Sequence, residues 1–472
     1  MTREFSQRDL TLLAANPSLH ASSLAPARAI IIHDPTDTLL QVLSSKLLGS
    51  CLAHGLRIYI VAKIGRIGDI DLRLRPLAYH SQLQFLESTR LKQIPENCAR
   101  FDAGPSYAPP AALNIIGLTG GAPAEDEILL RRAFADCTQL ELRKMDSGTA
   151  SVFQGFVTLR DSRAGPVPLP FFIKVDRYPK ASKELRNYAD CTALFVPFDA
   201  RPNIDERRCL LGAERGLIVG NFVERSEALI RVVERSASYC PVIDSLFNHA
   251  LRGWRAQAHW RQDPPPAQAM EPEGAIRSFR DARFLRKASE CEAQSRRSNG
   301  LTLSPTQIGD MLDALPPVVH RRALAHGDLH GENVVAVDGR AVLIDFVNVA
   351  DGPLVKDPAA LETWLFLKIT SDPADWARTA DELYSWSNLV TLPQSRAPTQ
   401  PLSGVWNVIR QIRQFALSEQ LTVGEYAQAV AIQLLRHTLR KDPGEQDHRR
   451  PTFMKLAANL AESLKRTRSS LA

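Results

Sequence analysis

The sequence predicts an α+β chain of 472 residues in three parts: a small α/β part, a β-rich part and a mainly helical part. Three observations support this fold class. Apolar strand patterns alternate with helical patterns over residues 26–120, which is typical of a small parallel sheet. Short strand patterns dominate residues 125–225, and amphipathic helical patterns dominate residues 226–472. The length alone favours more than one core.

The composition is that of a soluble globular protein, with 44% hydrophobic and 23% charged residues. No apolar run reaches the roughly 18 residues of a membrane span, and the segment after Met1 lacks the apolar core of a secretory signal. Seven cysteines are scattered without a C-x-x-C pair, which favours a reducing compartment over a disulfide framework or a zinc site. We therefore expect a cytoplasmic protein without a membrane partner.

The net charge of +6 is a mild excess for this length. It is compatible with binding of nucleotides or acidic partners and does not indicate a nucleic-acid-binding protein. The charge concentrates in a helical pattern over residues 277–297. This helix either faces an acidic substrate or presents a solvated surface, and both interpretations remain open.

Residues 1–25 read as a leader, and residues 26–120 as a separate α/β domain. Strands are expected at residues 29–33, 56–62, 99–102 and 113–118, and helices at residues 36–53 and 77–91. Asp34 follows the first strand. This pattern resembles, weakly, a receiver-like domain with Asp34 as an acidic pocket residue. The alternative is an α/β adaptor without chemistry, which binds a protein partner. Residues 105–123 are rich in Pro and Gly and form the expected junction.

The β-rich part opens with a helical pattern at residues 124–135 and continues with strand patterns at 140–143 and 152–159. The turn between these strands contains Gly148 and Ser151. A strand, a turn of small residues and a return strand can lay backbone N–H groups over phosphates. An ordinary hairpin turn is the alternative, because the turn has a single glycine.

Lys174 stands inside the apolar strand pattern of residues 169–175, where a charge is costly unless it finds a partner. Glu184 follows ten residues later in a helical pattern over residues 182–188. A Lys on a strand paired with a Glu on a helix is typical of kinases. The alternative is an edge-strand Lys that reaches solvent beside a surface Glu. Further strands are expected at 192–198, 209–213 and 216–223, with a hinge at 219–224.

The helical part contains one continuous polar motif, His326-Gly-Asp-Leu-His-Gly-Glu-Asn333. Strands at residues 334–337 and 341–344, joined by Asp338-Gly339, predict a tight hairpin that ends at Asp345. Such a hairpin brings the Asn333 amide and the Asp345 carboxylate close together. Hard oxygen ligands suit Mg²⁺, and Asp328 would lie nearby to deprotonate a hydroxyl. This layout is typical of a phosphoryl-transfer site.

The other elements of this part are helices. They are expected at residues 244–260 with Asp244 as N-cap, 304–315, 358–369, 405–415, 423–439 and 453–464.

The loop and hairpin resemble the catalytic and metal-binding segments of kinase-fold phosphotransferases. The resemblance is closest to the aminoglycoside/choline kinase-like branch, whose pattern is HGD-L-H-x-x-N followed by IDF. Gly327 stands where protein kinases carry Arg. Residues 351–362 also resemble a bacterial family called the ternary complex associated domain. The resemblance implies a two-lobed protein-kinase-like fold, with a β-rich N-lobe at 125–225 and an α-helical C-lobe at 226–472.

The resemblance also implies roles for individual residues. Asp328 would be the catalytic base, and His326 and Asp357 would support the loop. ATP would be bound through Lys174, Glu184, Gly148 and Ser151, and Mg²⁺ through Asn333 and Asp345. Glu332, beside the metal site, would alter metal affinity or add a ligand.

Two hypotheses follow. The first is an ATP- and Mg²⁺-dependent phosphotransferase acting on a hydroxyl of a small molecule or a protein. The second is a nucleotide-binding pseudokinase or adaptor in a bacterial signalling or conflict complex. The intact set of Lys174, Glu184, Asp328, Asn333 and Asp345 favours the first. The acceptor is not specified by any motif.

Overall fold

The computed structural model describes most of the chain from residue 113 onward and parts of the segment before it. The chain divides into two compact units, Met1–Ala189 with Pro202–Val223, and Asp190–Arg201 with Glu224–Ala472. The described residues are 3–4, 29–42, 57–63, 65–67, 69–70, 83–89, 113–118, 123–134, 136–145, 150–159, 166–167, 169–206, 208–211, 215–236, 239–262, 282–316, 318–392, 398, 402–439 and 449–469.

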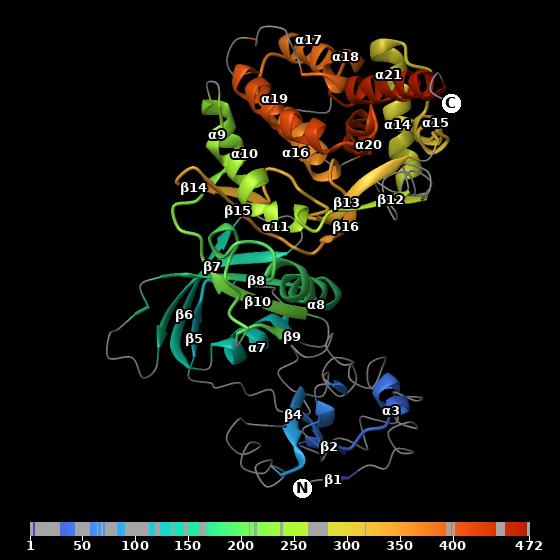
Figure 1. Cartoon of the computed structure of the whole chain (residues 1–472). Helices are drawn as coiled ribbons and strands as arrows, with labels where there is room; N and C mark the ends of the chain where they lie inside the picture. The colour runs from blue at the N-terminus through green and yellow to red at the C-terminus, as the bar shows by residue number, and fades with distance from the viewer. Residues whose placement is uncertain are drawn as a thin grey trace. The chain divides into compact units, whose positions relative to one another are not determined.

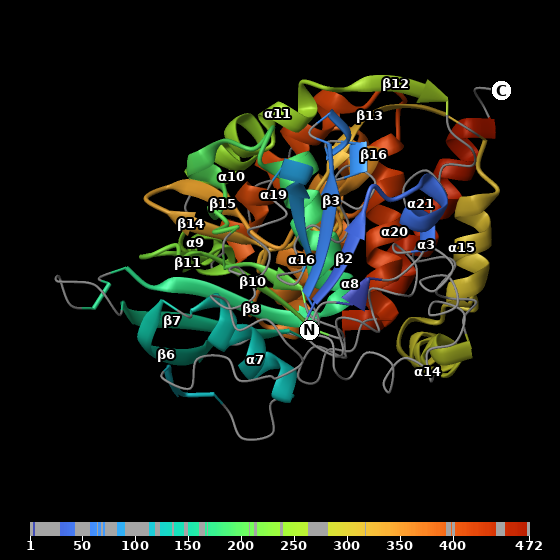
Figure 2. The ribbon, with the colours of Figure 1, turned by 90° about the horizontal axis from the view of Figure 1, so that it is seen from below.

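The first unit begins with the predicted parallel sheet. Its described residues form four strands in the order β1-β2-β3-β4, and Figure 2 shows β2 and β3 side by side. The strands are β1 Arg3–Glu4, β2 Ala29–His33, β3 Arg57–Ala62 and β4 Leu83–Glu87, with helix α3 Asp37–Val42 after β2. The expected first strand of the receiver-like domain is β2, which lies between β1 and β3. This order does not confirm the receiver-like interpretation, which stays a prediction.

Two expectations for this segment were wrong. Residues 83–87 form strand β4 and not part of a helix, because pairing with the buried β3 outweighs the local helical pattern. Strand β5, Asn114–Ile116, pairs with the strand that opens the β-rich part and not with the first sheet. The strand expected at 99–102 lies outside the described residues.

In the second sheet the described residues form six strands, in the order β5-β6-β7-β8-β10-β9. Apart from the parallel β5–β6 pair, its strands are antiparallel, as short connections allow. Helix α7 precedes β6 in the chain, and helix α8 follows β8. The bounds are β6 Cys137–Met145, β7 Ser151–Leu159, β8 Phe171–Arg177, β9 Leu210–Leu211, β10 Arg215–Asn221, α7 Ala124–Ala133 and α8 Tyr178–Asn187.

Helix α8 is fixed to this sheet by apolar packing. Ala181 and Leu185 pack with Leu211 and Ile218 in one buried cluster. At Gly216 a Cβ atom would lie 2.4 Å from the Ala181 Cβ. A glycine is needed there, since any larger residue would push the helix away from β10.

The second unit is mainly helical, with two small sheets. The sheets have the orders β11-β14-β15 and β12-β13-β16. Their strands are β11 Glu227–Ala228, β14 Val334–Val337, β15 Arg340–Leu343, β12 His259–Gln262, β13 Val319–Ala325 and β16 Ala350–Pro353. The predicted hairpin is formed by β14 and β15, which pair from Val334–Leu343 to Val337–Arg340.

Helix α20 lies among α14, α15, α16, α18 and α21, and α16 also packs against α19 (Figure 1). Four buried tryptophans lie in this unit, Trp254, Trp364, Trp376 and Trp406. The helices are α9 Leu229–Arg235, α10 Pro241–Ser245, η7 Leu246–Ala250, α11 Arg252–Arg255, α14 Ala282–Asn299, α15 Pro305–Asp313, α16 Lys356–Lys368, α17 Pro373–Leu383, α18 Trp386–Val390, α19 Leu402–Glu419, α20 Glu425–Leu439 and α21 Arg449–Ser469. None of the described helices is both long and apolar enough to span a membrane.

The segment Asp190–Arg201 belongs to the second unit although the chain on both sides of it belongs to the first. The Trp254 indole donates to the Cys191 carbonyl at 2.6 Å, and the Asp199 carboxylate accepts from His249 at 2.9 Å. At Gly253 a Cβ atom would lie 2.0 Å from the Phe195 carbonyl oxygen, so only glycine admits the segment.

Three expectations in this region were wrong. Residues 192–198 form no strand: they run from the end of the π-helix η5 Tyr188–Thr192 through turns to the 3-10 helix η6 Phe198–Ala200. The backbone N–H groups of Phe195 and Val196 bond back to the Thr192 carbonyl, which closes turns instead of a strand. The helix expected from Asp244 already begins at Pro241, with Cys240 at the N-cap position. It also ends before Trp260, which lies on β12.

A buried ion pair ties α16 to α19. The Arg413 guanidinium donates to Glu362 at 3.0 Å, and both side chains are fully buried. Arg413 also donates to the Leu383 and Asn388 carbonyls at 2.8 Å, and Tyr426 donates to Glu362. Both charged groups thus have several hydrogen-bond partners, which burial of charge requires.

We predict that Arg413→Met destabilises the protein by about 3–5 kcal/mol, because Glu362 would be left buried without its partner. Arg410→Met is the matched control, since Arg410 is exposed on the same helix, and it should change stability by less than about 0.5 kcal/mol. Chemical denaturation of both variants checks this. Equal stabilities would contradict the role assigned to the ion pair.

Candidate active site

Lys174 and Glu184 meet inside the first unit. The Lys174 ammonium donates to the Glu184 carboxylate at 2.7 Å, and the residues are only 6% and 7% exposed. Lys174 stands on β8 opposite Val152 of β7 and Ile218 of β10, so β8 is an inner strand. The alternative of an edge-strand Lys that reaches solvent is therefore excluded. An ammonium this deeply buried needs the carboxylate to offset its desolvation.

The turn expected to cover phosphates is only partly described. Ser151 is the first residue of β7, half-buried and opposite Val175. Gly148 lies outside the described residues. The role of this turn in cofactor binding therefore stays a prediction.

In the second unit, residues 326–333 form a loop between β13 and β14. Gly327 has a φ of +78°, and a Cβ atom there would lie 2.2 Å from the Asn348 carbonyl oxygen. Backbone conformation and close approach both require glycine at this position. The Arg that protein kinases carry here would fit neither requirement.

The Asp357 carboxylate holds the start of this loop from the first turn of α16. It accepts from the backbone N–H of His326 at 2.6 Å and of Gly327 at 3.0 Å. Burial raises the pKa of this carboxyl, opposed by His326 and the two backbone donors. The His326 ring in turn donates through Nε2 to the Ile344 carbonyl at 3.0 Å. Both residues thus lie where a loop-supporting role requires them.

The hairpin turns at Asp338 and Gly339, which have φ angles of +49° and +77°. Two successive positive φ angles define a type I′ turn, whose twist matches that of paired strands. The pairing extends one step further, because the Ile344 N–H donates to the Asn333 carbonyl at 3.0 Å. Asp345 therefore follows directly after the residue opposite Asn333, as the sequence predicts.

Asp345 itself has a φ of +64°. The left-handed region costs an L-residue about 1–2 kcal/mol, although Asp and Asn tolerate it best. Strained backbone of this kind is often kept where a side chain must be aimed at a functional point.

The Asn333 amide has a defined orientation. Its Nδ2 donates to the Asp328 carbonyl at 2.9 Å and lies 3.1 Å from His330 Nε2. With both amide protons directed to these groups, the Oδ1 atom is left to accept or coordinate. The Asn333 amide oxygen and the Asp345 carboxylate would supply hard oxygens, the ligand type that fits Mg²⁺ completed by waters and phosphates. Among the described residues, no group of three His, Cys, Asp or Glu offers an all-protein metal site.

Sequence reasoning missed Trp364, which holds the middle of the loop. Its ring lies against Gly331, where a Cβ atom would approach it to 2.2 Å, and it stacks on His330 with centroids 5.8 Å apart. Asp357 and Trp364 both belong to α16. This helix therefore holds the loop at two points. The only signal in the sequence was the glycine at position 331.

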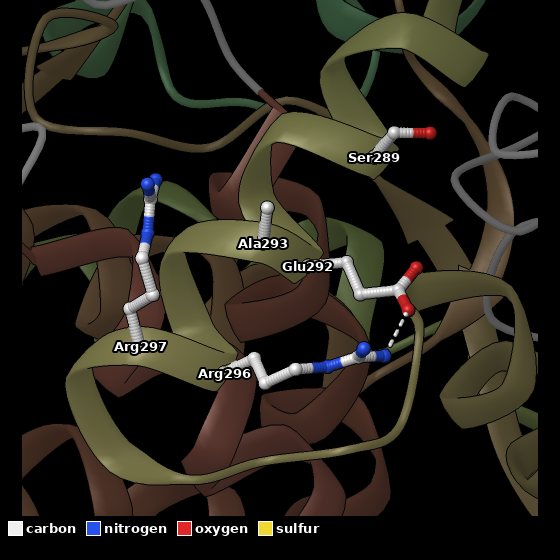
Figure 3. A pocket seen from close by; sticks show the side chains of 5 residues that line it. All are labelled: Ser289, Glu292, Ala293, Arg296 and Arg297. Carbon is white, nitrogen blue, oxygen red and sulfur yellow. Dashed lines mark hydrogen bonds and ion pairs between the residues drawn. The ribbon is translucent and has the colours of Figure 1, made fainter.

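A surface hollow of about 440 Å³ lies along α14, lined by Ser289, Glu292, Ala293, Arg296 and Arg297 (Figure 3). The Arg296 guanidinium is paired with Glu292 at 3.0 Å and is largely exposed. This pair is typical of a solvated helix face. Arg297, another of the basic residues expected to face an acidic substrate, is exposed as well. The other five lie outside the described side chains.

Comparison with known proteins gives one family match. Residues 248–438 match the family model of ternary complex associated domain 9. The chain resembles this family over that range. The resemblance suspected from the sequence is thereby confirmed for the part of the chain that holds the loop, the hairpin and α16. The ternary complex associated domain match does not include Lys174 or Glu184.

No curated protein matches the chain. Among solved structures, a thermostable mutant of aminoglycoside phosphotransferase APH(4)-Ia, in ternary complex with AMP-PNP and hygromycin B, shares 12% identity at a TM-score of 0.34, covering 69% of this chain and 93% of that one. A glucosamine kinase shares 13% sequence identity at a TM-score of 0.37. The match covers 71% of this chain and 95% of the glucosamine kinase chain. The macrolide 2'-phosphotransferase MphH from Brachybacterium faecium shares 14% sequence identity at a TM-score of 0.36. The match covers 72% of this chain and 98% of the MphH chain. TM-scores this low do not by themselves establish a common fold.

We predict that Asp357→Asn destabilises the protein by about 1–3 kcal/mol. The Asn side chain has a single acceptor oxygen, so its NH₂ group would face one of the two backbone N–H groups that Asp357 now accepts. Asp372→Asn is the matched control. Asp372 also accepts two backbone N–H bonds, at the exposed N-cap of α17, where Asn caps as well as Asp. Thermal unfolding of the two variants checks this. A loss as large in the control as in Asp357→Asn would contradict the prediction.

Proposed function

We propose that this protein is an ATP- and Mg²⁺-dependent phosphotransferase of the aminoglycoside phosphotransferase-like class, which transfers the γ-phosphoryl group to a hydroxyl acceptor. The supporting observation is the closed hydrogen-bonded circuit of the loop and hairpin. Asn333 bonds to Asp328, Ile344 to Asn333, and His326 to Ile344. This circuit supports the proposal because Asp328 and Asn333 lie on it and Asp345 follows it directly.

Each polar group has a role that follows from its surroundings. The Asp328 side chain is about one-third exposed, so it is accessible to an incoming hydroxyl and would accept its proton. Asn333 Oδ1 and the Asp345 carboxylate would hold Mg²⁺, which neutralises phosphate charge when bound. Lys174, kept in one position by Glu184, would neutralise charge on the α- and β-phosphates.

The alternative is a kinase-fold module that binds nucleotide, or nothing, and acts through protein partners. It is favoured by the single glycine of the turn around residue 148 and by a family description that refers to a complex. A protein partner would then bind through residues 26–120. Nucleotide binding and turnover separate the two proposals.

We expect ATP to stabilise the protein only when Mg²⁺ is present, by about 2.7 kcal/mol at a hundredfold excess over Kd. Asp345→Asn should lose most of this gain, because it removes the metal-binding charge while Asn tolerates the same left-handed backbone. A thermal-shift titration with and without Mg²⁺ measures this. Absence of any shift in the wild type would contradict the proposal and favour the alternative.

We expect Asp328→Asn to retain this thermal shift and to lower turnover by about 10²–10⁴. The assay follows ADP release, with water as the hydroxyl acceptor. Asp338→Asn is the matched control, since it removes an exposed carboxylate from the turn of the same hairpin and should leave turnover unchanged. Wild-type turnover in Asp328→Asn would rule out its role as base.

A further inference from the structure

Asp176 is a buried carboxylate two residues after Lys174 on β8, and the chemistry proposed above gives it no role. Side chains two apart on a strand share one face, and α8 packs against β8. Asp176 is only 4% exposed. Its carboxylate accepts the backbone N–H of Arg177 at 2.7 Å, and the Lys180 ammonium lies 3.9 Å from it. Such partners offset the cost of burying its charge.

Two ion pairs therefore join β8 to α8, and their polarities are opposite. The first joins Lys174 of the strand to Glu184 of the helix at 2.7 Å. The second joins Asp176 of the strand to Lys180 of the helix. Residues four apart lie on one face of a helix, so both helix residues face the strand. A positive and a negative charge thus follow one another on each element, in complementary order.

Apolar contacts repeat this arrangement. Gly216 stands opposite Asp176 on the neighbouring strand β10, and Ala181 approaches it closely. Two residues further along β10, Ile218 packs in one cluster with Ala181 and Leu185, which directly follow the two charged residues of the helix. Apolar contact is non-directional. The charges are therefore the directional contacts between these elements.

The charge pattern disfavours the neighbouring registers of α8. A shift of the helix by one turn in one direction would place Lys180 beside Lys174. A shift in the other direction would place Glu184 beside Asp176. Each of these is a pair of like charges, and like charges brought together exclude an arrangement as effectively as missing contacts do.

We infer that Asp176 and Lys180 are positioning residues, which hold α8 in the register where Glu184 meets Lys174. The catalytic part of this inference rests on the proposed function, in which the Lys174 ammonium neutralises phosphate charge. The register of the helix is a property of the protein without nucleotide.

Charge reversal on the helix tests the inference. Lys180→Glu places a like charge beside Asp176 and offers Lys174 a competing carboxylate one turn before Glu184. It should lower ADP release by up to about 100-fold, because a displacement of about 1 Å can cost this much. Lys183→Glu is the matched control, since Lys183 is exposed on the same helix. This control and Lys180→Arg, which keeps the charge, should leave ADP release unchanged.

Two further measurements show whether Lys180 acts through Glu184. In a Glu184→Gln background, Lys180→Glu should cause no further loss of turnover, because residues that act as one unit are not additive. In ¹⁵N–¹H NMR of the protein without ligands, the Lys174 ammonium should exchange slowly with water, since it is buried and bonded to a carboxylate. Its signal, assigned by its absence in Lys174→Met, should be lost in Lys180→Glu and kept in Lys183→Glu.

Asp176→Asn tests the same register from the strand and serves if Lys180→Glu does not fold. It keeps an oxygen for the Arg177 N–H and removes the charge. The Lys174 ammonium should then exchange faster than in the wild type. Unchanged exchange in Asp176→Asn would contradict the inference.

An unchanged Lys174 signal in a folded Lys180→Glu would overturn the inference, as would an equal loss in Lys183→Glu. A further loss of turnover in the Glu184→Gln background would also overturn it, because Lys180 would then act independently of Glu184. A wild type without ADP release contradicts the proposed function instead, and the NMR measurement still decides the register.

Discussion

The buried Asp357 carboxylate is the constraint on which the second unit's loop depends. Backbone N–H groups that turn away from regular structure must find acceptors when they are buried. Here His326 and Gly327 face the same carboxylate, and the left-handed backbone at Gly327 makes this possible. Because Asp357 stands at the start of α16, the position of the loop is set by a helix packed in the core. Precise sites are usually built on such rigid elements.

The same logic appears in a different form in the first unit. The buried Lys174 ammonium is paired with the Glu184 carboxylate, and Glu184 is placed by the packing of α8 on the sheet. Gly216 permits that packing by leaving room for Ala181. In both units, then, a glycine admits a close approach, and the close approach places a charged group beside its partner.

Local sequence predicted what local geometry determines. The Asp338-Gly339 turn, the hairpin and the strand with Lys174 form as predicted, because turn chemistry and strand alternation act over a few residues. Strand β4 was not predictable, since its conformation depends on pairing with β3. The roles of Asn333, Asp345 and the other residues expected to bind metal or nucleotide or to act in catalysis remain predictions.

Trp364 was missed for another reason. A tryptophan in a helix is ordinarily a core residue, and only the fold shows that its ring supports His330. Similarly, the buried pair Arg413 and Glu362 gave no signal, because charged residues in amphipathic helices are normally exposed. Contacts distant in sequence carry this information.

The inserted segment Asp190–Arg201 bears on how the molecule can be divided. The chain passes from one unit to the other after residues 189, 201 and 223. A fragment that begins at Glu224 would therefore omit part of its own core. Without residues 190–201, the Trp254 indole would lose the Cys191 carbonyl as its acceptor, and the Gly253 backbone would lose its contact with the Phe195 carbonyl. The second unit is thus not a separable module in sequence, and insertion, shuffling or independent expression would have to carry this segment along.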